Sequence, residues 1–403
     1  MVQEWPRRKL EEICDIIAGQ APSSKYYNEE GKGIPFLTVN SFGRIYPKIE
    51  RWTTKSLKES REGDVLFSVA GSLGLVNLGI TACITRSIFA LRPNQNLVLQ
   101  KFLFYALKKY GSQIASLGSG TAQKVITIKQ ISEFEIPLPP LPIQQKIVKI
   151  LDTIQEAIDI QDKIIEKTKE LKKSLMGELF KYGGPSFRKG RKLKQTELGE
   201  IPEDWEVVRL GDKKLFEIKL GGTPNTSVSE YWNGEIPWIT PNDLSQLRTP
   251  YIENTQRKIS ILGLKVGSTL LPENSIILST RAPIGYVALL RKPMAFNQGC
   301  KGIVIKDKSV VSVFLYYFLL SKTILLQELG TGSTFRELAT SDLGNFKIPL
   351  PPLPEQQEIA EILQTVDQKI EIERQKKELY EELFKTMLNK IMNQEIDVNL
   401  LDY

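Results

Sequence analysis

The sequence has 403 residues, of which 41% are hydrophobic and 25% charged, with a formal net charge of +7. These proportions are those of a soluble globular protein, and the length predicts more than one domain. Histidine is absent, which excludes Ser-His-Asp and Cys-His catalytic arrangements and histidine-based metal sites. The mild basic excess allows a polyanionic partner without requiring one.

Cysteine usage and the lack of long apolar runs indicate a cytoplasmic protein. Cys14, Cys83 and Cys300 are isolated and odd in number, which favours a reducing compartment over a disulfide framework. We expect them to be buried apolar side chains, because no two have the spacing of metal ligands. No apolar run approaches the ~18 residues of a membrane span, and residues 1–8 are polar and charged, unlike a signal peptide. The sequence indicates no cofactor and no metal.

The first 135 residues predict a compact module of short strands and one helix. Strands are indicated at 16–18, 34–40 and 65–69, where β-branched and aromatic residues are bounded by turn residues. A helix is indicated at 101–110, and a loop rich in glycine and serine follows at 117–121.

A proline-rich run at residues 136–142, IPLPPLP, ends this module. Proline fixes φ and lacks an N–H group, so the run itself is not helical. The residues after it contain no proline and are apolar at helical spacing, which predicts a long helix at 143–182. The basic segment at 188–194 follows the glycines that stop this helix. We interpret the segment as a solvated linker, and the alternative is a nucleic-acid-binding arm.

The second half of the chain repeats the first. IPLPPLP recurs at 348–354, an offset of 212 residues (348 − 136 = 212). Gly19 recurs as Gly221 at an offset of 202 (221 − 19 = 202), and the strand at 65–68 recurs at 276–279. The offset changes only between elements, as insertions in surface loops produce. The chain is therefore an internal duplication of one module and one helix.

The predicted fold is mixed α/β (α+β), with two tandem modules that alternate with two long helices. The expected segments are a first module at 1–142, a helix at 143–182, a basic linker at 183–200, a second module at 201–354, a helix at 355–393 and a tail at 394–403.

Both helices carry an apolar stripe with the heptad spacing of a coiled coil. The apolar seam positions are Ile147, Leu151, Ile154, Ile158, Ile165, Leu175 and Leu179 in the first helix and Ile359, Leu363, Val366, Ile370, Tyr380, Phe384, Met387 and Ile391 in the second. Charged residues fill the outer faces. The stripe predicts that the helices pair with each other, and the alternative is two separate amphipathic helices, each packed on its own module.

With its duplication, proline runs and helices, the chain resembles the specificity subunit of type I restriction–modification systems. The motifs that carry the resemblance are KQTELGEIPEDW at 194–205, GSTFR at 332–336 and IPLPPLPEQQ at 348–357. The first half departs from the pattern, with GSGTAQK at 118–124. The resemblance covers the whole chain.

The resemblance implies two target-recognition domains, each of which reads one half of a split double-stranded DNA sequence. It implies that the helices pair antiparallel, act as a spacer between the half-sites and dock two methyltransferase subunits. A nuclease–translocase subunit would join for cleavage, so that the complex would be an adenine methyltransferase and ATP-dependent endonuclease. The chain itself would be non-catalytic, in agreement with its lack of a P-loop or a glycine-rich nucleotide motif after a strand.

Recognition of DNA needs phosphate anchors and readers of base edges. Lys124 and Arg336 each follow a loop of small residues, where backbone N–H groups and a cation suit a phosphate; a surface cation beside a turn is the alternative. Thr38, Asn40, Thr240 and Asn242 end their predicted strands with hydroxyl and amide groups that suit base edges or phosphates; asparagine as a plain turn residue is the alternative. Further candidates beside later strands are Arg86, Thr280, Arg281, Gln298 and Lys301.

Two other functions stay open at this point. A coiled-coil scaffold whose modules bind a partner other than DNA would share the helices, and a steep loss of affinity with salt would distinguish DNA binding from it. An enzyme is disfavoured by the missing histidines and nucleotide motifs.

If the helices are antiparallel with Ile147 opposite Ile391, then Gln161 lies opposite Lys377, and polar residues in the seam specify the register.

Overall fold

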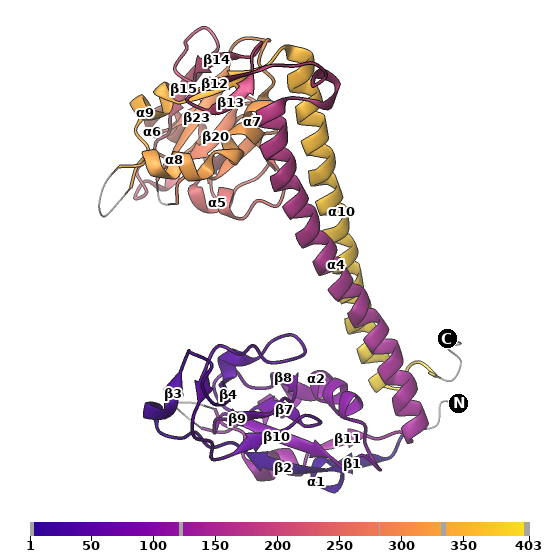
Figure 1. The fold of residues 1–403 in the computed structure, drawn as a ribbon. Helices are drawn as coiled ribbons and strands as arrows, with labels where there is room; N and C mark the ends of the chain where they lie inside the picture. Colours follow the sequence, from indigo (N-terminus) through magenta and orange to yellow (C-terminus); the bar gives the residue numbers. More distant parts are fainter. Residues whose placement is uncertain (1–3, 121–123, 282, 332–335, 399–403) are drawn as a thin grey trace. The chain divides into compact units, whose positions relative to one another are not determined.

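The computed structural model describes residues 4–120, 124–281, 283–331 and 336–398. The chain divides into two compact units, unit 1 with residues 1–160 and 377–403 and unit 2 with residues 161–376. Each unit contains one sheet-rich module together with parts of both long helices (Figure 1). No described helix is both long and apolar enough to cross a membrane.

Unit 1 is built around a four-stranded antiparallel sheet in the order β2-β10-β7-β8. A second, mixed sheet has the order β3-β5-β4-β9-β6, and β1 pairs with β11. The strands are β1 Arg7–Lys9, β2 Cys14–Ala18, β3 Tyr27–Asn28, β4 Ile34–Leu37, β5 Trp52–Thr53, β6 Glu59–Ser60, β7 Val65–Ser68, β8 Val76–Leu78, β9 Ala82–Ile84, β10 Ile88–Pro93 and β11 Glu135–Pro137. The helices of the module are α1 Leu10–Ile13, α2 Gln100–Ser116 and α3 Ile128–Ser132, with 3₁₀ turns η1 Ser24–Tyr26 and η2 Val39–Ser41.

The sheet around β7 is covered on both faces, which explains its unbroken apolar sequence. Val65 and Phe67 face the core that contains α2, whereas Leu66 between them faces the second sheet. The same alternation divides Phe89 from Ala90 in β10. Side chains of a strand alternate between its faces, so each strand contributes to two cores, and burial of each large apolar side chain contributes ~1.5–3 kcal/mol.

Unit 2 repeats this architecture. Its main sheet has the order β15-β23-β20-β21-β17, a second sheet has the order β18-β16-β22-β19, β12 pairs with β13, and β14 pairs with β24. The strands are β12 Leu193–Thr196, β13 Gly199–Pro202, β14 Glu206–Arg209, β15 Phe216–Leu220, β16 Trp232–Ile239, β17 Tyr251–Ile252, β18 Lys258–Ile259, β19 Thr269–Leu271, β20 Ile276–Ser279, β21 Val287–Leu290, β22 Met294–Phe296, β23 Cys300–Ile305 and β24 Lys347–Leu350. Its shorter helices are α5 Pro241–Ser245, α6 Ile261–Gly267, α7 Ser312–Ser321, α8 Thr323–Leu329 and α9 Thr340–Asn345, with 3₁₀ turns η3 Pro185–Phe187 and η4 Ser229–Tyr231.

The strand order and register confirm the internal duplication. The order β2-β10-β7-β8 of unit 1 corresponds to β15-β23-β20-β21 of unit 2. Ile88 of β10 pairs with Ser68 of β7, and Cys300 of β23 pairs with Ser279 of β20, at the positions that the sequence offsets match. Both units therefore carry the same sheet in the same register.

The predicted strand at 34–40 is too long at its end. Strand β4 stops at Leu37, and the 3₁₀ turn η2 takes the next residues. The side-chain oxygen of Ser41 accepts a hydrogen bond from the Thr38 N–H group at 3.1 Å. Local side-chain bonds of this kind compete with the sheet ladder for backbone groups, so the chain turns where sequence alone indicated strand.

The two long helices are α4 Leu141–Tyr182 and α10 Leu353–Met392, and Figure 1 shows them side by side. Within unit 1, Ile147 of α4 shares a core with Ile391 near the end of α10. Within unit 2, Lys172 near the end of α4 pairs with Asp367 of α10 at 2.6 Å. The helices thus pack in antiparallel directions. Every apolar seam position that the sequence indicated is buried or half-buried, whereas the pairing of Gln161 with Lys377 stays a prediction.

A buried glutamine fastens the first turn of each long helix to its module. The Gln144 side chain accepts a hydrogen bond from the Leu99 N–H group at 2.9 Å and donates to the carbonyl oxygens of Leu97 and Pro139 at 2.9 and 2.8 Å. Gln356 accepts from Val311 N–H at 2.9 Å and makes the corresponding donations to Ser309 and Pro351. The first glutamine after each proline run is therefore the residue that joins helix and module.

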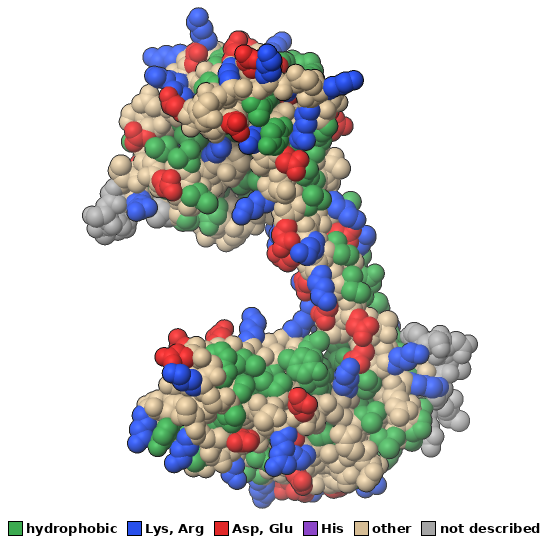
Figure 2. Space-filling model, viewed as in Figure 1, with side chains coloured by type: hydrophobic (Ala, Val, Ile, Leu, Met, Phe, Trp, Pro, Cys, Tyr) green, Lys and Arg blue, Asp and Glu red, His purple; other side chains and the backbone are tan. Residues whose placement is uncertain are grey.

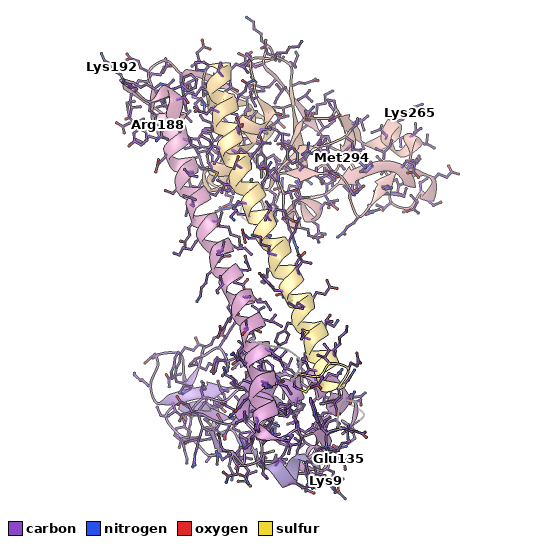
Figure 3. The ribbon with its side chains drawn as sticks, turned by 90° about the vertical axis from the view of Figure 1, so that its right-hand side faces the viewer. Lys9, Glu135, Arg188, Lys192, Lys265 and Met294 are labelled. Atoms are coloured by element: carbon purple, nitrogen blue, oxygen red, sulfur yellow. The ribbon has the colours of Figure 1, made fainter. Side chains whose placement is uncertain are left out.

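The basic segment after α4 is folded, and the interpretation of it as a solvated linker is wrong for Arg191. Hairpin β12–β13 occupies part of the segment, and Figure 3 shows Arg188 and Lys192 near the end of α4. The Arg191 side chain is only 9% exposed. It donates to Glu355 at 2.7 Å and to Asp204 at 2.6 Å, and these bonds raise the pKa of Arg191.

Glu355 explains why Arg191 is buried. This carboxylate is fully buried at the start of α10 and also accepts hydrogen bonds from the Trp205 indole at 2.9 Å and the Gly184 N–H group at 3.0 Å. A buried charge needs a paired and hydrogen-bonded partner. The basic segment supplies it, so Arg191 is a structural residue.

Candidate nucleic-acid interface

A cleft in the module of unit 1 brings together three of the residues that the sequence singled out. Its volume is about 780 Å³, and Thr38, Asn40 and Arg86 lie in its wall. The remaining lining residues are Ala21, Tyr27, Phe36, Val39, Arg51, Ala70, Gly71, Thr85, Ser87 and Val125. The rings of Tyr27 and Phe36 stack with their centroids 4.2 Å apart. The cleft therefore combines aromatic surface with amide, hydroxyl and guanidinium groups.

The threonine and the asparagine of each turn have different roles. Thr240 is the N-cap residue of α5, and its hydroxyl donates to the Asp243 carboxylate at 2.5 Å while its N–H group donates to the same oxygen at 2.8 Å. Thr240 thus closes a capping box, and Thr38 holds the same N-cap position before η2. Asn40 and Asn242, by contrast, are exposed. Asn242 makes one long contact of 3.5 Å to Gln256, so the asparagines are the groups that face solvent.

Lys124 and Arg336 lie at matching positions, each next to a residue that bridges to the segment after β7 or β20. Val125, next to Lys124, bridges to Ala70 and Ser119, and Glu337, next to Arg336, bridges to Arg281 and Thr331. Both cations are exposed. Parts of the loops that the sequence indicated here, 121–123 and 332–335, lie outside the described residues.

Arg86 and Gln298 occupy the same turn of the two modules, because their numbers differ by 212 (298 − 86 = 212). Both are exposed and lie in the turn that leads into β10 or β23. Gln298 accepts a hydrogen bond from the Thr223 hydroxyl. The structure therefore places an arginine and a glutamine at equivalent points.

The glycine that the sequence repeats at offset 202 holds this turn in place. A Cβ atom on Gly19 would lie 2.2 Å from the Thr85 carbonyl oxygen, and one on Gly221 would lie 2.1 Å from that of Asn297. Only glycine permits so close an approach of two backbones. The glycines explain why the segment after β2 or β15 packs directly against the turn.

Two candidates are buried and do not reach solvent, which corrects their assignment as possible DNA contacts. Thr280 is fully buried, and Lys301 is 3% exposed. The Lys301 ammonium group donates to the Leu338 carbonyl oxygen at 2.6 Å and to the Thr280 hydroxyl at 3.4 Å, and burial lowers the pKa of Lys301. These residues fasten the chain after Arg336 to β20 and β23.

Arg281 is intermediate between the exposed and the buried candidates. Its guanidinium Nε donates to Glu337 at 3.0 Å, and its side chain is 48% exposed. Arg281 therefore holds the segment beside Arg336 in place through Nε, while part of its guanidinium group stays exposed to solvent.

Sequence reasoning missed an arginine that holds a matching position in each module. Arg51 lines the cleft of unit 1, and in unit 2 Arg257 lies 3.7 Å over the Trp232 ring. The Phe36 N–H group donates to the Arg51 carbonyl oxygen, and Trp238 N–H donates to that of Arg257, so the two arginines match. The offset between them is 206 rather than 202, and this shift hid the correspondence.

The charge of the modules is not gathered into one continuous basic surface on the face seen in Figure 2. Lys and Arg side chains alternate there with Asp and Glu over each unit. Individually placed cations therefore determine the local potential more than the net charge does.

The described residues contain no group of three or more His, Cys, Asp or Glu residues that could hold a metal ion. All three cysteines are free and buried, as expected. Burial raises the pKa of Cys14 and of Cys300 to about 12, so neither is a ready thiolate nucleophile.

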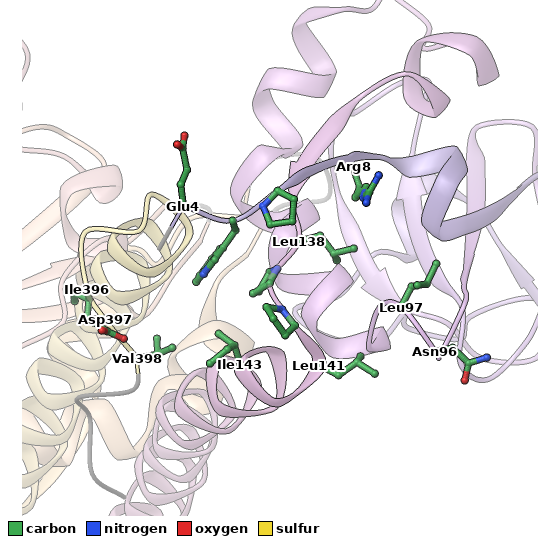
Figure 4. Close-up of a pocket in the computed structure, with 14 residues that line it drawn as sticks. Glu4, Arg8, Asn96, Leu97, Leu138, Leu141, Ile143, Ile396, Asp397 and Val398 are labelled. Atoms are coloured by element: carbon green, nitrogen blue, oxygen red, sulfur yellow. The ribbon is translucent and has the colours of Figure 1, made fainter. Parts of the chain in front are cut away.

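A second cleft of unit 1, about 740 Å³ in volume, is separate from these residues (Figure 4). It lies between the N-terminal segment, the proline run and the segment after α10. Its lining residues are Glu4, Trp5, Pro6, Arg8, Asn96, Leu97, Leu138, Pro139, Pro140, Leu141, Ile143, Ile396, Asp397 and Val398. Ile143 stands where the repeat in unit 2 has Glu355, the partner of Arg191, so the repeats differ here.

The chain contains two copies of one sheet module. Each copy carries exposed amide and cationic side chains at matching positions and is fastened to the long paired helices. This arrangement defines a protein with two recognition modules. The family described as the type I restriction modification DNA specificity domain matches residues 2–170 and 202–382, once in each repeat. The chain belongs to this family. It is a specificity subunit, the non-catalytic part of a type I restriction–modification complex, and its role is DNA recognition.

Curated relatives agree with this assignment. The chain is 29% identical over 415 residues to the putative type I restriction enzyme MjaX specificity subunit of Methanocaldococcus jannaschii, covering 98% of this chain and 94% of the relative. It is 42% identical over 206 residues to the MjaIX specificity subunit of the same organism, a match that spans about half of each protein, 49% and 47%.

Solved structures share the fold. A chain from a type I restriction–modification system described for its complex assembly and conformational transition has a TM-score of 0.64 at 20% identity, over 96% of this chain and 97% of that one. The S subunit from M. genitalium has a TM-score of 0.55 at 18% identity, over 96% and 95%.

Proposed function

We propose that the modules at 1–142 and 201–354 are two target-recognition domains, each reading one half of a split target in double-stranded DNA in the cytoplasm. The observation that carries the proposal is the matched set of exposed side chains on the two modules. Asn40 matches Asn242, Arg86 matches Gln298, and Lys124 matches Arg336. A duplicated reader explains why exposed polar residues recur at equivalent points of two modules.

The residues divide into two tasks. Lys124 and Arg336 anchor phosphates, because each is an exposed cation next to a residue that bridges to the segment after β7 or β20. Asn40, Asn242, Arg86 and Gln298 read base edges, for which amide and guanidinium groups have suitable donors and acceptors. Arg281 assists next to Arg336. Thr38, Thr240, Thr280 and Lys301 support these readers from within the module.

The long helices set the distance between the half-sites and dock two methyltransferase subunits, with nuclease–translocase subunits joining for cleavage. Helix α4 has 42 residues, or about 60 Å at 1.5 Å per residue, more than one turn of DNA at ~34–36 Å. Exposed apolar side chains recur on the outer helix faces at the 212-residue offset and support repeated docking. They are Ile160 and Ile372, 53% and 48% exposed, and Leu171 and Leu383, 52% and 43% exposed.

Salt dependence of binding tests the phosphate anchors. The affinity of the full chain for duplexes that contain its split target is measured between about 50 and 200 mM salt. Replacing Lys124 or Arg336 by alanine is expected to weaken binding equally on all sequences and to reduce the salt slope by about 1. Lys129→Ala removes an exposed cation of α3 and serves as the control. Unchanged slopes in both anchor variants would contradict this assignment.

Insertion of one heptad in the middle of both helices tests the spacer. Seven residues add about 10.5 Å, the rise of about three base pairs at 3.4 Å each. The recognised gap is expected to lengthen by about three base pairs while both half-sites stay the same. An active insertion variant that recognises the original gap would refute the spacer.

A further inference from the structure

Arg86 and Gln298 hold one structural position in two modules but differ in chemistry. The residue after Arg86, Ser87, accepts a hydrogen bond at its carbonyl oxygen from Val69 N–H at 2.8 Å. The residue after Gln298, Gly299, accepts the corresponding bond from Thr280 N–H, also at 2.8 Å. The two turns therefore have the same backbone frame, and their side chains start from equivalent points.

The frame of this turn is fixed from a second side as well. The backbones of Gly19 and Gly221 press against the carbonyl groups of Thr85 and Asn297, and the gap leaves no space for a Cβ atom. Gly19 N–H also donates to the Ile88 carbonyl oxygen at 3.0 Å. A side chain that discriminates between bases must start from a backbone that does not yield, because specificity depends on geometry held to a fraction of an ångström.

Each of the two side chains presents free donors. Among the described residues Arg86 has no side-chain partner, and it lies in the wall of the cleft that also contains Asn40. Gln298 accepts a hydrogen bond from the Thr223 hydroxyl, which orients the amide and leaves its NH₂ group and one lone pair of its oxygen for a ligand. One module thus offers a guanidinium fork and the other an oriented amide.

These two groups match different bases in the major groove. Arginine donates two hydrogen bonds to O6 and N7 of guanine, whereas glutamine donates to N7 and accepts from N6 of adenine. Building on the function proposed above, we infer that Arg86 reads a guanine in the half-site of the first module and Gln298 reads an adenine in the half-site of the second. The shared frame makes this one position a determinant of base choice in both halves.

Reciprocal substitutions test the inference in the whole complex. The chain is deleted in its source cell and replaced by wild type, Arg86→Gln or Gln298→Arg, and the methylated motif is read by genome-wide sequencing. In Arg86→Gln one guanine of one half is expected to relax or change to adenine, and in Gln298→Arg one adenine of the other half is expected to relax or change to guanine. The discrimination should change about five- to 150-fold, since a good bidentate pair contributes ~1–3 kcal/mol.

A matched control and a second assay keep the test decisive. Lys129→Gln removes a cation that is 82% exposed in the same module and should leave the motif unchanged. If a variant methylates nothing, its binding to duplexes that differ only at the guanine or adenine position is measured. Loss confined to the original base supports the inference, and equal loss on all sequences overturns it.

The outcomes also separate this inference from the proposed function. Variants that methylate the wild-type motif with unchanged base frequencies overturn the assignment of Arg86 and Gln298, while the two-module reader stands. A wild-type motif that fails to return when the chain is restored overturns both.

Discussion

Substitution of Gln144 by alanine tests how the first module is fastened to its helix. Gln144 is fully buried and satisfies three backbone groups, the N–H of Leu99 and the carbonyl oxygens of Leu97 and Pro139. These groups belong to the start of α2 and to the proline run. In the alanine variant these three backbone groups lose their hydrogen-bond partner.

The expected cost follows from these three bonds. A neutral hydrogen bond contributes a net ~1 kcal/mol to stability, so the loss of all three destabilises the junction by about 3 kcal/mol. This corresponds to about a 100-fold increase in the population of the locally open state, since ~1.4 kcal/mol is a factor of ten. Gln356→Ala should have the same effect in unit 2, where the amide contacts Val311, Ser309 and Pro351.

Hydrogen exchange measured by mass spectrometry on the full chain resolves the two junctions. Gln144→Ala is expected to accelerate exchange in residues 97–107 and to leave 309–320 unchanged, and Gln356→Ala is expected to do the reverse. The adjacent Gln145 and Gln357 are exposed, so their alanine variants are matched controls. Equal exchange in Gln144→Ala and Gln145→Ala would refute the role of the buried amide.

Three further predictions concern charge and burial. Burial, with Arg44 nearby, lowers the pKa of Lys108 to about 8 from the usual ~10.4, so the unfolded chain binds more protons between these pH values. The free energy of unfolding of unit 1 should therefore rise by up to about 3 kcal/mol between pH 8 and 10.4. Denaturant titrations should show this rise in the wild type and not in Lys108→Met. A parallel rise in the wild type and the variant would contradict the role of Lys108. Glu355→Ala leaves Arg191 without its buried partner and should destabilise unit 2 by ~3–5 kcal/mol, measured by hydrogen exchange at 183–205, whereas Glu361→Ala, at an exposed site of α10, should not. Cys14 and Cys300, with pKa values raised to about 12 by burial, should resist iodoacetamide at pH 8 in the native chain and react after denaturation; rapid native labelling would show that they are accessible.

Repetition and helical periodicity were the features that the sequence predicted best. The offset of 212 between the proline runs anticipated two modules with the same sheet, and β10 and β23 indeed pair with β7 and β20 in the same register. The apolar stripe anticipated which helix residues are buried, because periodicity depends only on the order of residues along one helix.

The sequence did not predict the tertiary partners of individual side chains. Lys301 follows a turn in sequence, yet its ammonium group lies inside the module because the Leu338 carbonyl oxygen needs a donor there. Arg191 lies in a basic run typical of a linker, yet the buried carboxylate of Glu355, more than 160 residues away, pairs with it. Thr38 and Thr240 have a local role as capping residues. The sequence alone did not distinguish this role from base reading. The burial of Lys301 and that of Arg191 each depend on a contact between distant segments.

The measurement that tests the central claim most directly is genome-wide sequencing of adenine methylation in the source cell with this chain deleted and then restored. The account predicts that one split motif, two short halves around a fixed gap, is lost on deletion and returns on restoration. A methylome that is the same in the presence and absence of the chain would contradict it.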